Sequence, residues 1–180
     1  MSKPRFITLE GGEGGGKSTQ VARLAGRLRA AGMQVVATRE PGGAEGAEMI
    51  RKLLIEGDPG RWDAMSEMLL HFAARRDHLR RTVLPALERG HWVISDRFAD
   101  STMAYQGVAQ GVGREAVEAL YRLVIGDLRP DLTFILDVPV DTGLGRVAAR
   151  GPDNRYERMG ADFHQRLRQA FLDIAKRRRW

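Results

Sequence analysis

The segment GGEGGGKS, residues 11–18, constrains the fold more than any other part of the chain. It fits the pattern G-x-x-x-x-G-K-[ST] and lies between an apolar run at 5–10, RFITLE, and a segment at 17–31 with the apolar spacing of a helix. In that setting the glycines let backbone N–H groups turn inward around phosphate oxygens, and the helix adds its positive N-terminal end. The flanking elements favour a phosphate-binding loop (P-loop) over a loop that is only flexible.

The loop pattern also gives its side chains roles. Lys17 is expected to reach the β- and γ-phosphates of a nucleotide, and the Ser18 hydroxyl can ligate Mg²⁺. Glu13 is unusual, because a carboxylate inside the loop would repel a triphosphate unless it faces a neutral or cationic group. We interpret Glu13 as facing a sugar hydroxyl or a metal-bound water of a neighbouring substrate. A surface carboxylate without a role is the alternative.

Strand and helix signals alternate along the whole chain. Further apolar strands are expected at 34–38, 91–95 and 132–138, and helices at 66–88, where Pro85 could introduce a kink, at 114–125, at 140–150 and from 161 onward. This order predicts an α/β fold in three layers, a parallel sheet with helices on both faces. No repeat or linker divides the sequence, so we expect a single domain over 1–180. Ligands of such sheets bind at the carboxyl ends of the strands.

The composition narrows the partners and the compartment. The chain carries 29 Lys and Arg against 23 Asp and Glu, a net charge of +6, which favours an anionic partner without identifying it. The basic run at 176–179 is interpreted as a solvated helix end, so no nucleic-acid partner is expected. The absence of cysteine excludes disulfides and thiolate metal sites. No apolar stretch approaches the roughly 18 residues of a membrane span, and 1–11 is too short for a signal peptide. A cytoplasmic protein without a membrane partner is expected.

Two arginines follow strands of the predicted sheet. Arg39 comes directly after the strand at 34–38, and Arg97 lies two residues beyond the strand at 91–95. Because the carboxyl ends of parallel strands share one edge, both guanidinium groups are expected near the P-loop, where they could hold a second phosphate. Asp96, beside Arg97, could hold Mg²⁺ through water. The alternative is an ordinary surface ion pair at each strand end.

One face of the helix expected at 66–88 carries a stripe of apolar residues that is interrupted by an arginine. Its members recur at spacings of three and four and comprise Met65, Leu69, Phe72, Arg76, Leu79 and Val83. Phe72 and Arg76 are therefore neighbours on the helix surface, and an aromatic ring beside a guanidinium suits a nucleobase. Taken alone, the stripe fits better a core phenylalanine and an arginine whose stem packs on apolar surface.

Polar and basic residues downstream offer further contacts. Ser101, Thr102, Tyr105 and Gln106 could read a base or a sugar, although alone they are ordinary polar residues. A helix end that runs into an arginine-rich loop at about 147–158 is expected to form a lid. An arginine from a closing lid can stabilise the charge of a moving phosphoryl group, and the candidates are Arg146, Arg150 and Arg155. Excess surface arginine is the alternative for each.

Taken together, these segments resemble bacterial thymidylate kinases, which are P-loop nucleoside monophosphate kinases. The resemblance spans residues 6–158 and rests on FITLEGGEGGGKSTQ, TREPGG, FAARR, DRFADSTMAYQG, LRPDLTFILDV and RVAARGPDNRYER. It implies a P-loop NTPase fold, ATP as the phosphoryl donor, dTMP as the acceptor, Mg²⁺ as the cofactor and a homodimer. The P-loop alone is generic, whereas the ordered set of segments is specific.

The resemblance also implies a role for each candidate residue. The catalytic residues would be Lys17, Arg97, Arg150 and Glu13, and the metal would be held by Ser18 and Asp96. ATP would be bound by Gly11, Gly12, Glu13, Gly14, Gly15, Gly16, Lys17, Ser18, Thr19 and Arg146. The residues around dTMP would be Glu10, Arg39, Phe72, Arg76, Arg97, Ser101, Thr102, Tyr105 and Gln106. Phe72 would stack on thymine, Arg76 would bind its edge and Tyr105 would lie beneath the deoxyribose.

One departure from the family and several alternative functions remain. Family members continue beyond the last helix into another strand and helix, whereas this sequence ends at Trp180. We expect either a truncated chain or a reduced adenine site, and an unpaired sheet edge, which favours aggregation. The alternatives are a kinase of another nucleoside monophosphate or of a deoxynucleoside, and a shortened nucleotide-binding form without turnover. A slow nucleotide switch is disfavoured because the chain lacks an N-K-x-D stretch.

Overall fold

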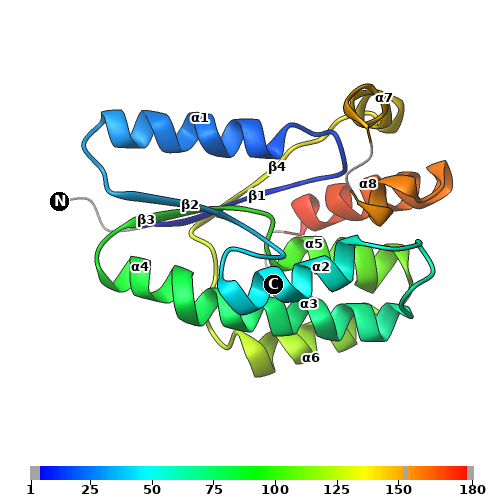
Figure 1. Ribbon diagram of the computed structural model, residues 1–180, viewed down its shortest axis with the longest axis horizontal. Coiled ribbons are helices and arrows are strands. Elements are labelled where there is room, and N and C mark those ends of the chain that lie inside the picture. The colour runs from blue at the N-terminus through cyan, green and yellow to red at the C-terminus, as the bar shows by residue number, and fades with distance from the viewer. Residues whose placement is uncertain (1–4, 152–153, 178–180) are drawn as a thin grey trace.

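A parallel sheet of four strands forms the centre of the molecule. The computed structural model describes residues 5–151 and 154–177, so positions 152–153 of the expected lid and 178–180 of the basic tail lie outside the described residues. The strands are β1 (Phe6–Glu10), β2 (Val35–Arg39), β3 (Trp92–Asp96) and β4 (Leu132–Ile135), in the order β2-β3-β1-β4. All four strands were predicted, although β4 ends three residues earlier than expected. The α/β class with helices on both faces is thus confirmed (Figure 1).

The register of the strands fixes which residues meet at the carboxyl edge. Asp96 on β3 aligns with Leu9 on β1 and with Arg39 on β2. Glu10 on β1 aligns with Ile135 on β4. The predicted neighbourhood of Arg39, Asp96 and the P-loop therefore exists. The apolar side chains of β1 are buried on both faces, which is why its sequence is a continuous apolar run.

Helix α1 (Lys17–Ala30) covers one face of the sheet (Figure 1). Its Val21 and Ala25 pack with Ile7, Leu9 and Ile94 of the sheet in one buried cluster. The helix begins directly after Gly16, which has the left-handed φ of 82°. This geometry turns the chain from β1 into the helix, and it positions Lys17 at the first helical residue.

A larger group of helices covers the opposite face. It contains α2 (Glu45–Ile55), α3 (Ala64–His78), α4 (Leu84–Glu88) and α6 (Arg114–Val124). Their core includes Phe72, Val83 and Val117, which pack with Phe6 and Val93 of the sheet. The predicted helix at 66–88 is continuous but changes to a π-helical turn at Leu79–Val83, directly before α4. Pro85 explains this change, because it lacks an N–H and crowds the carbonyl four residues earlier.

Helix α2 is an element that the sequence did not predict. The segment EPGGAEG at 40–46 was interpreted as a break, but α2 already begins at Glu45 within that segment and packs along α3. Ala47 and Leu54 are its buried residues. The residues at 99–109 form a short helix, α5 (Ala99–Thr102), and a π-helical segment, η2 (Met103–Ala109). They present the polar residues 101–106 discussed above.

The last elements close the end of the molecule beside the P-loop (Figure 1). They are α7 (Val140–Arg150), a 3₁₀ turn, η3 (Arg155–Arg158), and α8 (Ala161–Lys176). The cluster that holds them together joins Tyr105 to Tyr156, Phe163, Leu167 and Phe171. The lid segment is thus packed on the wall of the candidate site.

Two surface features complete the description. Strand β4 lies at an edge of the described sheet, and its Leu132 and Phe134 are 47% and 44% exposed. Among the described helices, none has the length and apolar character that crossing a bilayer requires.

Candidate active site

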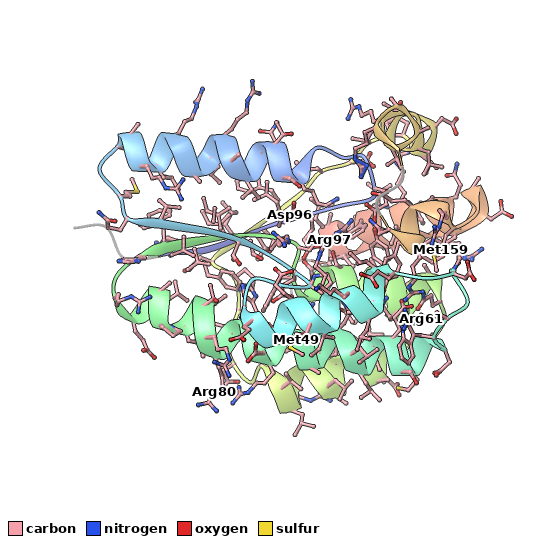
Figure 2. The ribbon with its side chains drawn as sticks, in the orientation of Figure 1. Met49, Arg61, Arg80, Asp96, Arg97 and Met159 are labelled. Atoms are coloured by element: carbon pink, nitrogen blue, oxygen red, sulfur yellow. The ribbon has the colours of Figure 1, made fainter. Side chains whose placement is uncertain are left out.

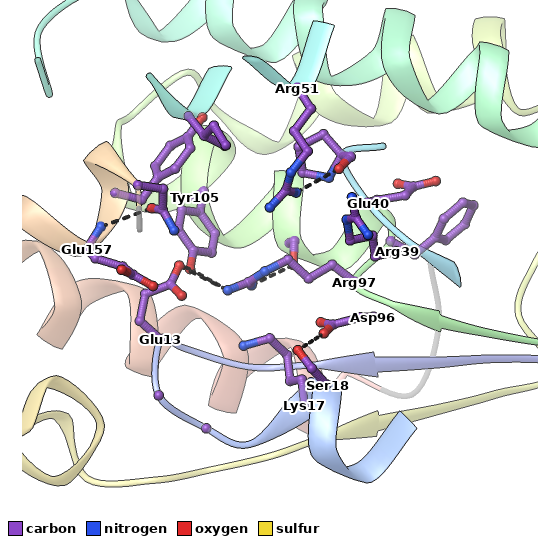
Figure 3. A pocket seen from close by; sticks show the side chains of 18 of the residues that line it. Glu13, Lys17, Ser18, Arg39, Glu40, Arg51, Asp96, Arg97, Tyr105 and Glu157 are labelled. Carbon is purple, nitrogen blue, oxygen red and sulfur yellow. Dashed lines mark hydrogen bonds and ion pairs between the residues drawn. The ribbon is translucent and has the colours of Figure 1, made fainter. Parts of the chain in front are cut away.

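A pocket of about 510 Å³ opens at the carboxyl ends of the strands. The P-loop forms one side, and residues from β2, α2, α3, β3, η2 and the lid segment form the others (Figure 3). The candidate residues that line it are Glu13, Gly14, Gly15, Gly16, Lys17, Ser18, Thr19, Arg39, Asp96, Arg97, Ser101, Thr102, Tyr105, Gln106, Arg146 and Arg150. One continuous pocket therefore contains most of the residues that the sequence singled out.

The P-loop is held in place by close packing against α7. Gly14 has a φ of 67°, and a Cβ added there would lie 2.1 Å from the carbonyl oxygen of Gly143. Only glycine permits both the left-handed backbone and this approach. Lys17 lies under the loop, where Nζ donates to the carbonyl oxygens of Gly11 (3.1 Å) and Gly12 (2.7 Å). Burial, with the Arg97 cation nearby, lowers the pKa of Lys17 to about 8.

Ser18 and Asp96 form the oxygen pair that could hold a metal ion. The Ser18 hydroxyl donates to Asp96 Oδ2 over 2.5 Å, at the mouth of the P-loop (Figure 3). Among the described residues no cluster of three or more His, Cys, Asp or Glu forms a preassembled metal site. Mg²⁺ does not need one, because it is usually bound through one or two protein oxygens together with phosphate oxygens and water. The donor set therefore fits Mg²⁺ carried in with a nucleotide.

Arg97 connects the P-loop to the segment that follows β3. It has an uncommon left-handed φ of 72°, and its guanidinium donates to the Gly11 carbonyl (2.9 Å), Ser101 Oγ (3.1 Å), Glu13 Oε1 (3.0 Å) and the Tyr105 hydroxyl (3.0 Å). The Tyr105 hydroxyl in turn donates to Glu13 Oε1 over 2.5 Å. These contacts hold the guanidinium beside the P-loop, as Figure 3 shows.

Glu13 thus faces a cation within the protein itself. Burial favours the neutral acid, but the charges of Arg97 and Lys17 outweigh it and lower the pKa of Glu13 to about 2. The carboxylate is therefore ionised at neutral pH. Its negative charge is matched by Arg97, which is how an acid is tolerated inside a phosphate-binding loop.

Glu10 is not among the residues that line the pocket, contrary to expectation. It is fully buried at the end of β1, where it accepts hydrogen bonds from the Phe98 N–H (2.8 Å) and the Ser101 hydroxyl (2.5 Å). Burial and the neighbouring Asp100 raise the pKa of Glu10 to about 8. Through these two hydrogen bonds its carboxylate supports the turn that follows β3.

The second correction concerns Phe72 and Arg76 on α3. Phe72 is 1% exposed and belongs to the core, while Arg76 is exposed and donates to the Val124 carbonyl over 3.1 Å. The pocket is lined instead by His71 and Arg75, one residue earlier in each case. Phe72, Leu79 and Val83 of the predicted stripe are buried, whereas its members Met65, Leu69 and Arg76 are exposed. Met68 and Arg75 are buried in their place.

Arg75 is fixed from several sides. Its Nε donates to Glu40 Oε2 (2.7 Å), and its Nη2 donates to the Phe98 carbonyl (3.0 Å) and to Thr102 Oγ1 (3.1 Å). The Phe72 ring lies beneath the guanidinium at 5.0 Å. Nη1 is buried and has no hydrogen-bond partner among the described residues. Phe72 therefore supports an arginine of the pocket, and Arg75 keeps one donor for a ligand.

His71 and Arg51 were missed by the sequence analysis. His71 Nε2 lies 3.0 Å from the Tyr156 hydroxyl of the lid segment, and burial together with Arg75 and other cations lowers the pKa of His71 to about 3. Its imidazole is neutral. Arg51 comes from the unpredicted helix α2, lines the pocket and donates to the Pro41 carbonyl over 2.8 Å. Arg39, expected there, also lines the pocket and pairs with Glu48 at 2.9 Å.

The candidate lid arginines occupy different places. Arg146 lines the pocket and donates to the Gly14 carbonyl over 3.1 Å. Arg150 also lines the pocket, is 47% exposed and pairs with Glu157. Arg155 is fully buried outside the pocket lining, where it binds the Leu54 and Pro59 carbonyls and pairs with Glu67. Its position indicates an anchor for the lid segment.

Comparison with known proteins gives this geometry a family. The family described as thymidylate kinase matches residues 9–180. A thymidylate kinase of Caulobacter vibrioides is 52% identical over 177 residues, which cover 98% of this chain and 85% of that protein. A thymidylate kinase of Ruegeria pomeroyi is 55% identical over 172 residues, with 95% and 81% covered. A crystal structure of thymidylate kinase from Ehrlichia chaffeensis superposes with a TM-score of 0.79 at 39% identity, covering 97% of this chain and 88% of its own. The chain belongs to the thymidylate kinase family.

Proposed function

We propose that the chain transfers the γ-phosphoryl group of ATP to dTMP, giving dTDP and ADP, as the family to which it belongs does. The observation that carries the proposal is a pair of buried polar atoms without a hydrogen-bond partner among the described residues, on two side chains that line the pocket: Nη1 of Arg75, a donor, and Oε1 of Gln106, an acceptor. Both side chains are almost fully buried, at 2% and 1% exposed. Buried polar groups without a partner are rare, so a ligand with the complementary pair is favoured.

Thymine offers that complementary pair. Its 4-carbonyl oxygen accepts and its adjacent N3–H donates, whereas cytosine offers the reverse, an amino donor and a ring-nitrogen acceptor. Arg75 would donate to the 4-carbonyl, and Gln106 would accept from N3–H. The neutral ring of His71 lines the same part of the pocket and would lie against the base. In this proposal His71 takes the stacking role that the sequence analysis gave to Phe72, and Arg75 takes the role that it gave to Arg76.

The sugar and the acceptor phosphate would occupy the middle of the pocket. Tyr105 would lie beneath the deoxyribose, with its hydroxyl tied to Glu13 and Arg97. Arg97 would contact the acceptor phosphate, and Arg39 and Arg51 lie on the pocket wall from which they could reach the same group. Glu13 would then face the sugar while it holds Arg97 in place. The P-loop would thereby serve both substrates.

The transfer itself needs positioning and neutralised charge. A dTMP phosphate oxygen forms a bond to the γ-phosphorus of ATP while the bond to the β–γ bridging oxygen breaks, and ADP leaves with that oxygen. Lys17 and the P-loop N–H groups hold the donor phosphates. Ser18 and Asp96 would hold Mg²⁺, which neutralises phosphate charge when bound. Arg150 is the lid arginine that we assign to the moving phosphoryl group, because it lines the pocket and is 47% exposed, whereas Arg155 is buried outside the pocket lining.

A homodimer in the cytoplasm completes the proposal. Helices α2, α3 and α6 lie together on one side of the molecule and expose large apolar side chains: Met49, Leu53, Met65, Leu69 and Leu123 (Figures 1 and 2). Exposed apolar side chains on adjacent helices suit an interface between two copies of the chain. The consumption of ATP is consistent with a cytoplasmic reaction.

A coupled assay of ADP release tests the function. We expect ATP consumption with dTMP, less with dUMP, and little with dCMP, AMP or thymidine. Turnover with thymidine or with AMP in preference to dTMP would assign the chain to another kinase class.

The variant Lys17→Ala should lose turnover while calorimetry still shows dTMP binding, because Lys17 serves the donor phosphates. Equal loss of turnover and of dTMP binding would argue against this division between the two substrates.

A further inference from the structure

Glu67 lies behind the pocket wall and has no place among the lining residues. It is on α3, and its side chain is fully buried. Oε1 accepts from Gln106 Nε2 over 2.6 Å and from Gln110 Nε2 over 2.9 Å. Oε2 accepts from Nη2 of Arg155, the buried anchor of the lid segment. One carboxylate thus joins a residue of the pocket to the lid segment.

The carboxylate decides which end of the Gln106 amide faces the pocket. An ion-paired carboxylate accepts hydrogen bonds and donates none, so it must be met by amide N–H groups. If Gln106 rotated its amide by 180°, its oxygen would face Glu67 Oε1 inside a dry environment, which is strongly unfavourable. Gln106 therefore keeps Nε2 toward Glu67 and leaves Oε1 for the pocket. In the described part of the chain, Oε1 of Gln106 is one of the buried side-chain atoms without a hydrogen-bond partner.

We propose that Glu67 is a positioning residue that determines specificity for the base. It orients Gln106 so that Oε1, a hydrogen-bond acceptor, faces the position of N3 of the base. This inference rests on the proposed function, since it assumes that a nucleobase binds beside Gln106. Thymine and uracil bring an N–H to that position, and cytosine brings a lone pair. With Glu67 in place, Oε1 of Gln106 faces the lone pair on N3 of cytosine, and the two acceptors repel each other. Without it, the Gln106 amide can rotate and present Nε2 to cytosine.

Gln110 and Arg155 also bind the Glu67 carboxylate. Gln110 Nε2 shares the same oxygen of Glu67, although Gln110 is outside the pocket lining, so it adds a second donor to the carboxylate without touching a ligand. Arg155 supplies the positive charge that matches Glu67, and it comes from the segment that also contributes Tyr156 to the pocket. Selection of the base and placement of the lid segment therefore depend on one buried carboxylate.

The test compares dTMP with dCMP as acceptors for the wild-type protein and for Glu67→Gln. The glutamine keeps the size of the side chain, but it can donate as well as accept, so Gln106 is free to rotate. The ratio of kcat/KM for dTMP over dCMP should fall at least about tenfold, since a fixed hydrogen-bonding site rejects the wrong partner strongly. A role in folding alone would lower both values together, and an unchanged ratio would overturn the proposal. Gln110→Ala, the matched control, should leave the ratio unchanged.

A measurement on the wild-type protein covers the case in which Glu67→Gln does not fold. A structure of the dTMP complex that distinguishes oxygen from nitrogen at Gln106 should show Nε2 on Glu67 and Oε1 on N3. The opposite orientation, or a Gln106 that does not contact the base, overturns the proposal. Failure of the proposed function is separately visible, because the wild-type protein would then not phosphorylate dTMP at all.

Discussion

Nη2 of Arg97 lies 3.0 Å from Oε1 of Glu13, so the acid of the P-loop is neutralised by the arginine that follows β3. The two side chains are 15% and 12% exposed. Both line the pocket, and the Tyr105 hydroxyl binds each of them. The pair lies where donor and acceptor nucleotides would meet. Changes to either residue should therefore affect the acceptor side as well as the donor side.

The first prediction concerns the stability of this pair against acid. The pKa of Glu13 is lowered to about 2 in the folded protein from an ordinary 4.5, so its ionised form contributes stability that is present above pH 4.5 and is lost as the pH falls toward 2. The free energy of unfolding of Glu13→Gln should accordingly be lower than wild type at pH 6. The difference should shrink as the pH is lowered to 3. Urea titrations at several pH values measure it, and a difference that does not vary with pH would contradict the pairing.

The second prediction concerns Lys17 and ATP. Burial and Arg97 lower the pKa of Lys17 to about 8 in the ligand-free protein, whereas a bound triphosphate favours the charged amine. ATP binding above pH 8 should therefore take up a proton, and the Kd for ATP should rise by up to about tenfold per pH unit. Calorimetry in buffers of different ionisation enthalpy measures the uptake. Binding of dTMP, which does not use Lys17, serves as the control and should show no such uptake.

The lowered pKa of Lys17 also determines how the free energy of unfolding changes with pH. The pKa of Lys17 is lower in the folded state than its ordinary 10.5, so between about pH 8 and 10.5 the unfolded chain binds more protons. The contribution of Lys17 to the free energy of unfolding should therefore rise with pH across that window. A comparison of wild type with Lys17→Met at pH 7.5 and 10 isolates it, since methionine has no proton to bind.

The third prediction uses two adjacent arginines of α3. Arg75→Lys should raise the KM for dTMP by about 10- to 100-fold, because lysine keeps the charge beside Glu40 but loses the planar fork that reaches both Thr102 and a base. Arg76→Lys changes the next residue in the same chemical way, on the exposed side of the helix. Its KM should remain within about twofold of wild type. Steady-state kinetics at saturating ATP decide between them, and a larger effect at Arg76 would restore the original assignment.

Much of the fold was predictable because its signals are local. The P-loop is encoded by contiguous glycines, and β1 and β3 by apolar runs that are buried on both sides. The arginine at 97 follows from the rule that parallel strands end at one edge. Local signals also explain the error at α2. Pro and Gly at 41–43 mark a true break, but they say nothing about the helix that starts two residues later.

The rest of the site depends on contacts between distant residues. His71 is identified by its hydrogen bond to Tyr156, and Glu67 is identified by its ion pair with Arg155. Both partners are far away in the sequence, so no local sequence pattern predicts these contacts. The choice between Arg75 and Arg76 depended on which edge of the predicted stripe is buried. Met65 and Leu69 suggested the wrong edge, because they are apolar yet 45% and 49% exposed. Glu10 was assigned to the pocket wrongly, because only its tertiary contacts with Phe98 and Ser101 show that its carboxylate is buried.

The last prediction separates the lid arginines by measurement. Arg150→Met removes a charge that lines the pocket, so kcat should fall by about 10³-fold while the melting temperature changes little, as for an arginine that acts on the moving phosphoryl group. Arg155→Met leaves Glu67 buried without its cation, which should lower the free energy of unfolding by about 3–5 kcal/mol. Thermal unfolding and single-turnover kinetics of the two variants, run side by side, measure both effects. If Arg155→Met kept full stability but lost turnover, the catalytic arginine would be Arg155, and the lid would have to open far enough to bring it into the pocket.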